Sequence, residues 1–405
     1  MTLPLTVDQL VAEALQANPE IRAAVRRLSL AQLKTGTARS LEDPMLMVRD
    51  WATPLRKPWD LNQAQVMVSL QQTFVSRDKR DMRARISSDD ANTASIDVET
   101  VRQQVAAEVR KACVDLARNA GEMVLHDRQA ALLKEAYEAA LAQYSAAKVP
   151  QADVLRAQMA ITRLGEHMIE LDQERDDARA RLNALLGRRP GEPIDVAGGY
   201  AAPSAIPSIE ELERLAIENR PELTSLRRQI TKSQDEGLLT RLATKPDFTA
   251  ALGYMLMPTG SFARSAYMAE LTINLPRLNR DRHDGEAHQA DAASDVARAE
   301  LEARTSSVFL EVRQAQIEVL AAQRRVRLYR ETLLPQAEAS FQASTAAYRN
   351  NRGDFLSLID SQNLLLDIET AAYKAQAAAD AGVAMLERTI GAPLAHEQGT
   401  ERKSK

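Results

Sequence analysis

The chain has 405 residues, of which 45% are hydrophobic, 27% charged and only 4% aromatic, which disfavours thick globular cores. With 52 basic and 56 acidic residues the formal net charge is −4, so no global positive field exists to hold nucleic acid. The single cysteine, Cys113, excludes an internal disulfide framework and a cysteine-rich zinc site, and we expect it to be buried and inert.

The sequence predicts no transmembrane helix, because it contains no run of 18 or more apolar residues. It begins MTLPLTVDQL, without a basic and then apolar leader, so we expect either a cytosolic protein or one whose leader has been removed. Whether a signal peptide and a lipidated cysteine preceded Met1 stays open at this point.

The chain reads as a tandem duplication. The segment TVDQLVAEALQANPEI from Thr6 aligns with SIEELERLAIENRPEL from Ser208 at an offset of 202, and later matches need 203 and then 204. Two small insertions explain this drift. We therefore expect a first repeat over 1–188, a connector between the repeats over 189–207, a second repeat over 208–391 and a C-terminal tail over 392–405.

Both repeats contain the same predicted elements in the same order. The first has a helix over 6–40, a strand pair over 44–74, a long helix over 76–147, a tip over 147–153 and a helix over 150–186. The second has a helix over 208–243, a strand pair over 246–276, a long helix over 279–348, a tip over 349–354 and a helix over 353–390. Pro19 and Pro221 predict a kink or restart near the start of each repeat. Turn-rich segments, TPLRKPWDLN and PTGSFARS, join the strands of each pair.

The strands alternate between an apolar and a polar side. In YMAELTINL, Tyr267, Ala269 and Leu271 share one face, whereas Met268, Glu270 and Thr272 share the other. Two isolated strand pairs leave unpaired edges, but three copies of a four-stranded chain would close into a twelve-stranded barrel, a form of sheet that a bilayer tolerates.

The predicted helix lengths suggest an elongated molecule. At 1.5 Å per residue the long helix extends roughly 108 Å, about as far as the two shorter helices of a repeat placed end to end. The helices alone therefore also allow a pore-free coiled-coil scaffold, which we keep as the alternative to a channel. The fold class is mainly α with a small β part in either case.

The chain resembles the TolC family of outer-membrane efflux channels. The opening LTVDQLVAEALQANPEI is similar to the family's amphipathic first helix with an internal Asn-Pro, and YSAAKVPQADVLRAQ and YRNNRGDFLSLIDSQ are similar to its paired periplasmic tips. The helix ends at Gly187 and Gly391 resemble its closing Leu-x-x-(Leu/Ile)-Gly motif. The resemblance implies a trimer with a twelve-stranded outer-membrane β-barrel on a helical barrel that crosses the periplasm of a Gram-negative type bacterium.

The resemblance also implies a gate at the periplasmic tips. By position, the gate tyrosine is Tyr348, the acidic residue of the first tip is Asp153, and the pore-constricting positions of the second tip are Ser357 and Asp360. The position of the basic partner is Gly353, preceded by Arg352, while Ala147 and Asn351 replace the glycines of the two tips. This sequence therefore departs from the family at several gate positions.

A ring of Asp360 carboxylates in a trimer would favour cations at a narrow neck. The alternative is that Asp360 is a solvated surface residue, and that Asp153 and Asp354 cap the helices after the tips. For docking of a periplasmic adaptor, itself coupled to an inner-membrane pump, the candidates are Lys148, Val149, Arg352 and Phe355. Packing of Val149 and Phe355 within their own tips is the competing interpretation.

We expect no cofactor, no resident metal and no enzymatic activity. His283 and His288 are five residues apart, about 140° around a helix, and so do not face one ion. The methionines of the strands are explained by apolar packing or lipid contact. No nucleophile-and-base motif, P-loop or Cys-x-x-Cys is present. The favoured function is a passive conduit for efflux or secretion, and the sequence leaves open its cargo, its pump class and the state of the gate.

Overall fold

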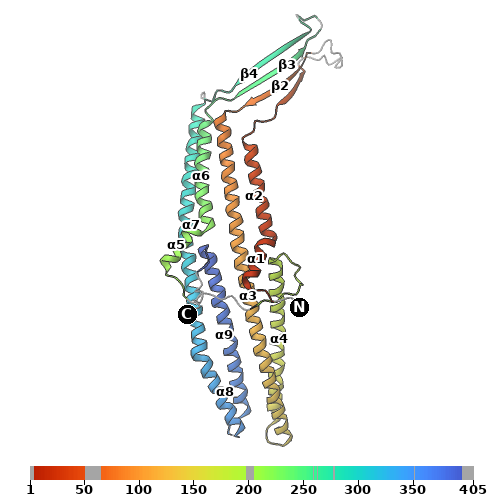
Figure 1. The fold of residues 1–405 in the computed structure, drawn as a ribbon, viewed down its shortest axis with the longest axis vertical. Coiled ribbons are helices and arrows are strands. Elements are labelled where there is room, and N and C mark those ends of the chain that lie inside the picture. Colours follow the sequence, from red (N-terminus) through yellow and green to blue (C-terminus); the bar gives the residue numbers. More distant parts are fainter. Residues whose placement is uncertain are drawn as a thin grey trace, which may run out of the picture. The chain divides into compact units, whose positions relative to one another are not determined.

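The computed structural model describes residues 4–50, 65–197, 205–258, 260–261, 263–276, 279–350 and 352–394. The expected loop over 53–62, Asn351 and the tail from residue 395 onward lie outside these residues. Helices dominate the described chain and one four-stranded sheet completes it, so the fold is mainly α with a small β part (Figure 1). None of the described helices is long and apolar enough to cross a membrane.

The elements follow the same order in both halves of the chain. The first half contains α1 (Val7–Ala17), α2 (Pro19–Ala38), β1 (Met45–Asp50), β2 (Val66–Phe74), α3 (Arg77–Ser145) and α4 (Gln151–Leu185). The second half contains α5 (Ile209–Asn219), α6 (Pro221–Leu242), β3 (Phe248–Leu256), β4 (Ser265–Ile273), α7 (Arg280–Leu328), η2 (Tyr329–Leu333), α8 (Leu334–Arg349) and α9 (Phe355–Ile390).

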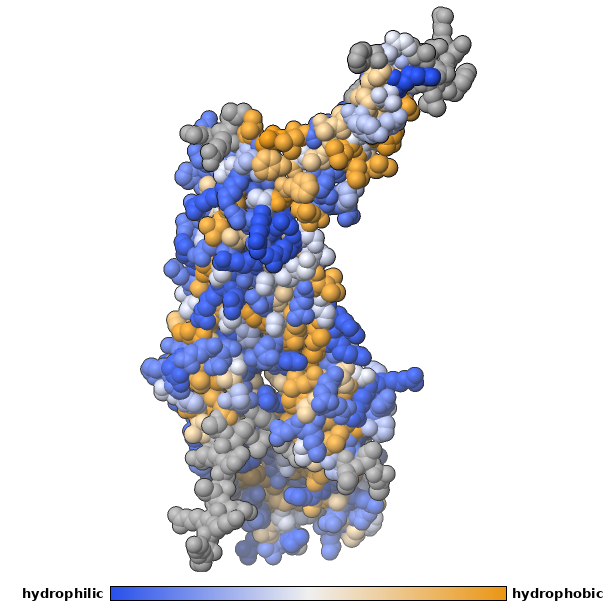
Figure 2. All heavy atoms as spheres, turned by 45° about the horizontal axis from the view of Figure 1, so that its top comes forward, coloured by the Kyte–Doolittle hydropathy of each residue, from blue (hydrophilic) through white to orange (hydrophobic). Residues whose placement is uncertain are grey.

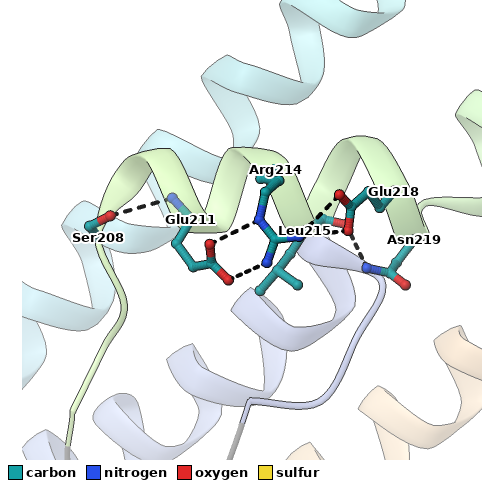
Figure 3. Close-up of polar contacts among 6 residues, drawn as sticks. All are labelled: Ser208, Glu211, Arg214, Leu215, Glu218 and Asn219. Carbon is teal, nitrogen blue, oxygen red and sulfur yellow. Dashed lines mark hydrogen bonds and ion pairs between the residues drawn. The ribbon is translucent and has the colours of Figure 1, made fainter.

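Each half starts with a short capped helix. Thr6 caps α1 in a capping box with Gln9, and the Ser208 hydroxyl accepts a hydrogen bond from the Glu211 backbone N–H at 3.4 Å. On α5, Arg214 lies between Glu211 and Glu218 and binds both carboxylates (Figure 3). Both short helices end two residues before the proline that starts the next helix, as the prolines predict.

One element was not expected from the sequence. The predicted helix over 279–348 is interrupted by the π-helical turn η2, where the Leu334 N–H bonds to the Tyr329 carbonyl five residues earlier. Pro335 follows directly in α8, and it lacks an N–H and crowds the carbonyl four residues before it. The wider π-helical turn is one way in which a helix accommodates such a proline.

The chain forms two compact units, which we describe separately. The helical unit comprises Met1–Ala23, Val98–Pro221 and Arg304–Lys405. The sheet unit comprises Ala24–Asp97 and Glu222–Ala303 and contains all four described strands.

The strands of the sheet unit pair antiparallel in the order β1-β2-β3-β4, which brings the strand pairs of the two repeats side by side. The register aligns Val48, Val68, Tyr254 and Tyr267 across the sheet, and the tyrosine rings meet edge to face at 5.5 Å. The apolar face defined by this row bears large exposed side chains, and Figure 2 shows hydrophobic side chains gathered over the strands. Its most exposed members are Leu46, Val48, Leu70, Leu252, Tyr267 and Leu271. The alternation predicted for β4 is therefore confirmed.

The helices of the sheet unit contain an ion pair between an exposed arginine and a buried aspartate. Asp235 of α6 is 1% exposed, and the Arg85 guanidinium of α3 binds both of its carboxylate oxygens, at 2.6 and 2.7 Å. Asp89, one turn further along α3, is also buried. Burial, and then the charge of Asp235, raise the pKa of the Asp89 carboxyl.

In the helical unit, the end of each repeat packs on its beginning. Gly187 and Gly391 follow α4 and α9 in left-handed conformations, with φ of 69° and 73°. A β-carbon on Gly187 would lie 2.8 Å from the Ala17 carbonyl oxygen, and one on Gly391 would lie 2.7 Å from that of Asn219. The Asn18 side chain also donates to the Leu185 carbonyl at 2.9 Å. In each repeat, the glycine that closes the repeat and the end of the short helix before the proline therefore form one junction.

Candidate functional site

The first candidate tip is the reversal between α3 and α4. The Ala147 N–H bonds to the Tyr144 carbonyl and the Lys148 N–H to that of Gln143, both at 2.9 Å, which closes the end of α3 in a Schellman-like turn. Ala147 has φ of 55°, the left-handed conformation that favours glycine. This is the position at which the resemblance expected a glycine.

The second candidate tip is the reversal between α8 and α9. Asp354 is the N-cap of α9 and accepts a hydrogen bond from the Ser357 backbone N–H at 2.9 Å. The bonds from Ser357 lower the pKa of the Asp354 carboxyl. The capping interpretation of Asp354 is thus correct, whereas α4 has Pro150 as its N-cap, so Asp153 does not cap that helix.

A small apolar core joins the two tips. Phe355 is 2% exposed and packs with residues of α3, α4 and α9, and Tyr348 packs against this core. The Tyr348 and Phe355 rings meet at 5.7 Å with an interplanar angle of 61°. The other buried members of the core are Leu133, Ala140, Val154, Ala157, Leu164 and Ile359.

Tyr348 interacts electrostatically with Asp153 near this core. Burial, and then the negative charge of Asp153, raise the pKa of the Tyr348 hydroxyl, against a smaller effect of Gln143. Asp153 is 8% exposed and forms an ion pair with Arg156 one turn later, at 3.3 Å. Sequence reasoning missed Arg156, although its spacing of three residues from Asp153 on a helix is a signal for such a pair.

The remaining predicted tip residues are distributed on the surface. Lys148, Arg352, Ser357 and Asp360 are exposed, and Val149 is partly exposed. Phe355 is not a docking residue in this structure, because its ring is buried in the joined tips. The competing interpretation, that it packs within the tips, is the correct one for this residue.

No group of three or more histidine, cysteine, aspartate or glutamate side chains able to hold a metal occurs among the described residues. The strand methionines share the sheet face opposite the apolar face, together with Arg49 and Gln71. Contact with lipid at the apolar face therefore does not explain them, whereas packing does explain Met67, which is 2% exposed. These methionines are Met45, Met47, Met67, Met255 and Met268.

Long helical hairpins with joined tips and a sheet with one exposed apolar face define the fold of an outer-membrane channel. The outer-membrane channel OprN has this fold, with a TM-score of 0.78 and 20% identity over 95% of this chain and 89% of that one. So does the MtrE outer membrane channel of Neisseria gonorrhoeae, solved in its open state, with a TM-score of 0.76 and 16% identity over 95% and 89% of the two chains.

The family model described as outer membrane efflux protein matches residues 10–188 and 212–392, and the chain belongs to this family. The cobalt-zinc-cadmium resistance protein CzcC of Cupriavidus metallidurans is 22% identical over 364 residues, which cover 89% of this chain and 84% of that protein. The chain is accordingly an outer-membrane efflux channel of the kind that works in tripartite pumps, and it extends into the periplasm. The alternative of a pore-free scaffold is discarded.

Proposed function

We propose that three copies of this chain assemble into a passive conduit, and that the tips of α3, α4, α8 and α9 form its gate. In this assembly the strands close into a twelve-stranded barrel in the outer membrane. A periplasmic adaptor docks at the exposed tip residues and couples the channel to an inner-membrane pump. Neither a cofactor nor catalysis has a part in this mechanism.

The exposed apolar face of the sheet carries the proposal of a membrane barrel. Leu46 and Leu252 are each 70% exposed and Tyr267 is 88% exposed, which would be costly for such a contiguous surface in water but is favourable against lipid. Within the described residues, β1 and β4 each have one strand partner. An open edge presents unpaired N–H and C=O groups, and closure with neighbouring copies satisfies them.

The electrostatic interaction of Tyr348 with Asp153 supports the gate. The Tyr348 side chain packs against the core that joins the hairpins and its hydroxyl senses the charge of Asp153, so separation of the hairpins changes the surroundings of both groups. Asp360 is exposed on α9, and threefold symmetry would place three copies of it around the axis if this face lines the pore. Ser357 and Arg352 complete the proposed constriction, and Lys148, Val149 and Arg352 form the proposed docking surface.

The assembly is tested on protein expressed with a secretion signal and purified in detergent. We expect the mass of a trimer and an elongated, tapered particle by negative-stain electron microscopy. A monomer or dimer that remains soluble without detergent would contradict the barrel.

The gate is tested by single-channel conductance in planar bilayers. Tyr348→Phe and Asp153→Asn should change the open probability, because they remove the buried hydroxyl and the negative charge that interact where the hairpins join. Asp360→Ala should reduce cation selectivity and block by multivalent cations, without opening the channel. Glu166→Gln, at an exposed position of α4, is the control and should behave like the wild type. Variants of Tyr348 and Asp153 that leave gating unchanged, or a D360A variant with unchanged selectivity, would refute these roles.

A further inference from the structure

Two histidines contact each other across the first hairpin of the helical unit. The rings of His126 in α3 and His167 in α4 have centroids 6.2 Å apart and planes inclined by 77°. His126 is 5% exposed, whereas the side chain of His167 is 59% exposed. Neither residue belongs to the tips, so the channel function described above does not account for this pair.

The hydrogen bonds of the two rings leave the same nitrogen available on each. The Nδ1 atom of His126 lies 2.9 Å from the Glu122 carbonyl oxygen, which can only accept, so this Nδ1 carries a proton. The Nδ1 atom of His167 lies 3.3 Å from a carboxylate oxygen of Glu170, another acceptor. In the neutral rings both Nε2 atoms therefore hold a free lone pair.

This arrangement is typical of histidines that bind metals. A metal-ligating imidazole usually donates its second nitrogen to a backbone carbonyl or a carboxylate, which orients the ring and makes it a better ligand. His126 has the first kind of partner and His167 has the second. Each partner lies on the helix of its own histidine, so these Nδ1 hydrogen bonds leave both Nε2 atoms unoccupied where the two rings meet across α3 and α4.

The spacing of the rings is close to that needed for a shared ion. With zinc–nitrogen bonds of about 2.0 Å, two imidazoles on one tetrahedral ion have centroids roughly 5 Å apart. The observed 6.2 Å requires the rings to approach by about 1 Å. The His167 side chain is exposed and can make this adjustment, whereas the buried His126 stays in place.

We propose that His126 and His167 bind one divalent transition-metal ion of the zinc class through their Nε2 atoms and so link α3 to α4. Because the described residues contain no group of three or more suitable ligands, water completes the coordination. With only two protein ligands, the affinity is lower than that of a closed structural zinc site. Imidazole suits Zn²⁺, Ni²⁺, Co²⁺ and Cu²⁺ and disfavours Mg²⁺.

The ion would extend an existing series of contacts between the two helices. The Asn119 side chain donates to the Leu171 carbonyl at 2.7 Å, and Arg118 of α3 forms an ion pair with Glu174 of α4, also at 2.7 Å. His126 and His167 lie further towards the α3–α4 reversal than these contacts. A metal bridge there would hold the hairpin together between the polar contacts and the apolar core of the tips, and it would stabilise the folded chain in proportion to its occupancy.

The experiment is a titration of the full-length protein, without a histidine tag and in detergent, with ZnCl₂ by isothermal calorimetry. We expect about one ion per chain, and His167→Ala and His126→Ala should each weaken binding at least tenfold. Glu170→Gln, which removes the negative charge from the partner of the His167 Nδ1, should weaken binding by a smaller factor. The control His283→Ala/His288→Ala removes the same number of imidazoles on α7 and should bind like the wild type.

Two further measurements keep the result interpretable. Thermal unfolding with and without Zn²⁺ should show stabilisation of the wild type and of the α7 control but not of His167→Ala; this variant should fold because its side chain is exposed. Mg²⁺ at the same concentration should have no effect. Binding of Zn²⁺ to the His126→Ala/His167→Ala double variant with wild-type affinity would overturn the proposal. So would the absence of Zn²⁺ binding to the wild type.

Discussion

Replacement of Gly391 by alanine tests whether the backbone conformation at the end of a repeat requires glycine. Gly391 has φ of 73° and ψ of 12° after α9, a conformation that costs an alanine about 1–2 kcal/mol. The new β-carbon would also lie 2.7 Å from the Asn219 oxygen, 2.9 Å from its carbonyl carbon and 3.1 Å from the Arg220 nitrogen. These are backbone atoms that cannot rotate away, so overpacking adds about 1–3 kcal/mol, for a total of about 2–5 kcal/mol.

Matched variants separate the two contributions. Gly391→Asn should recover part of the backbone cost, because asparagine tolerates the left-handed region, but it keeps the clash. Gly187→Ala should destabilise less than Gly391→Ala, because its β-carbon would approach a single backbone atom, the Ala17 oxygen, closer than 3.4 Å. Gly165→Ala, in the middle of α4, is the control. A β-carbon at this position would have no neighbouring atom within 4 Å, so the change should stabilise the helix by up to about 1 kcal/mol.

Thermal unfolding of the purified variants, followed by circular dichroism at one scan rate, ranks these effects even if unfolding is irreversible. The expected order of melting temperatures is Gly165→Ala, wild type, Gly187→Ala and Gly391→Ala, from highest to lowest. In the Gly391→Ala variant, hydrogen exchange should also be faster than in the wild type at the amides of residues 391 and 392, which bond to the last turn of α9. Equal melting temperatures for Gly165→Ala and Gly391→Ala would refute the argument.

Four further predictions follow from buried or strained groups. Arg85→Leu should lower stability by about 1–3 kcal/mol, because it leaves the buried Asp235 carboxylate without its ion-pair partner, although the Arg85 side chain itself is 59% exposed. Adding Asp235→Asn should restore much of the loss in chemical denaturation, and no rescue would contradict the ion-pair explanation. Ala147→Gly should stabilise the first tip by about 1 kcal/mol, since it relieves a left-handed alanine, and an unchanged or lower melting temperature would argue against strain there. Burial raises the pKa of the Cys113 thiol to about 12, so Ellman's reagent should label it only after denaturation, and rapid labelling of the folded protein at pH 8 would show that the site opens. Burial raises the pKa of the Asp380 carboxyl to about 6, so the folded state binds more protons than the unfolded state between pH 4 and 6. This contribution to stability is present at pH 4 and is lost as the pH rises through 6. The stability of Asp380→Asn, measured over the same pH range, should lack this decrease, and an equal decrease in the variant and the wild type would contradict the assignment.

Local signals in the amino-acid sequence predict the order and type of all the described elements except η2. Helical periodicity, strand alternation and proline positions are local signals, and here they agree with packing, as in the break between α1 and α2 at Pro19. The alternation in β4 placed Tyr267 and Leu271 on one face, because successive side chains of a strand point to opposite sides. The η2 turn was missed, because the wider hydrogen bonding around a proline leaves no distinct periodicity.

The contacts between distant residues could not be predicted from these local signals. That Gly391 packs on Asn219, that Tyr348 lies beside Asp153 and that Phe355 is buried all depend on contacts between segments far apart in the chain. The methionines of the strands alternate like any other strand residues, and only the register across β1–β4 gathers them on the face opposite the exposed leucines. His126 and His167 are 41 residues apart, and only the antiparallel packing of α3 and α4 brings their rings within 6.2 Å. Such pairings depend on helix rotation and strand register, which a one-dimensional pattern constrains only to a face.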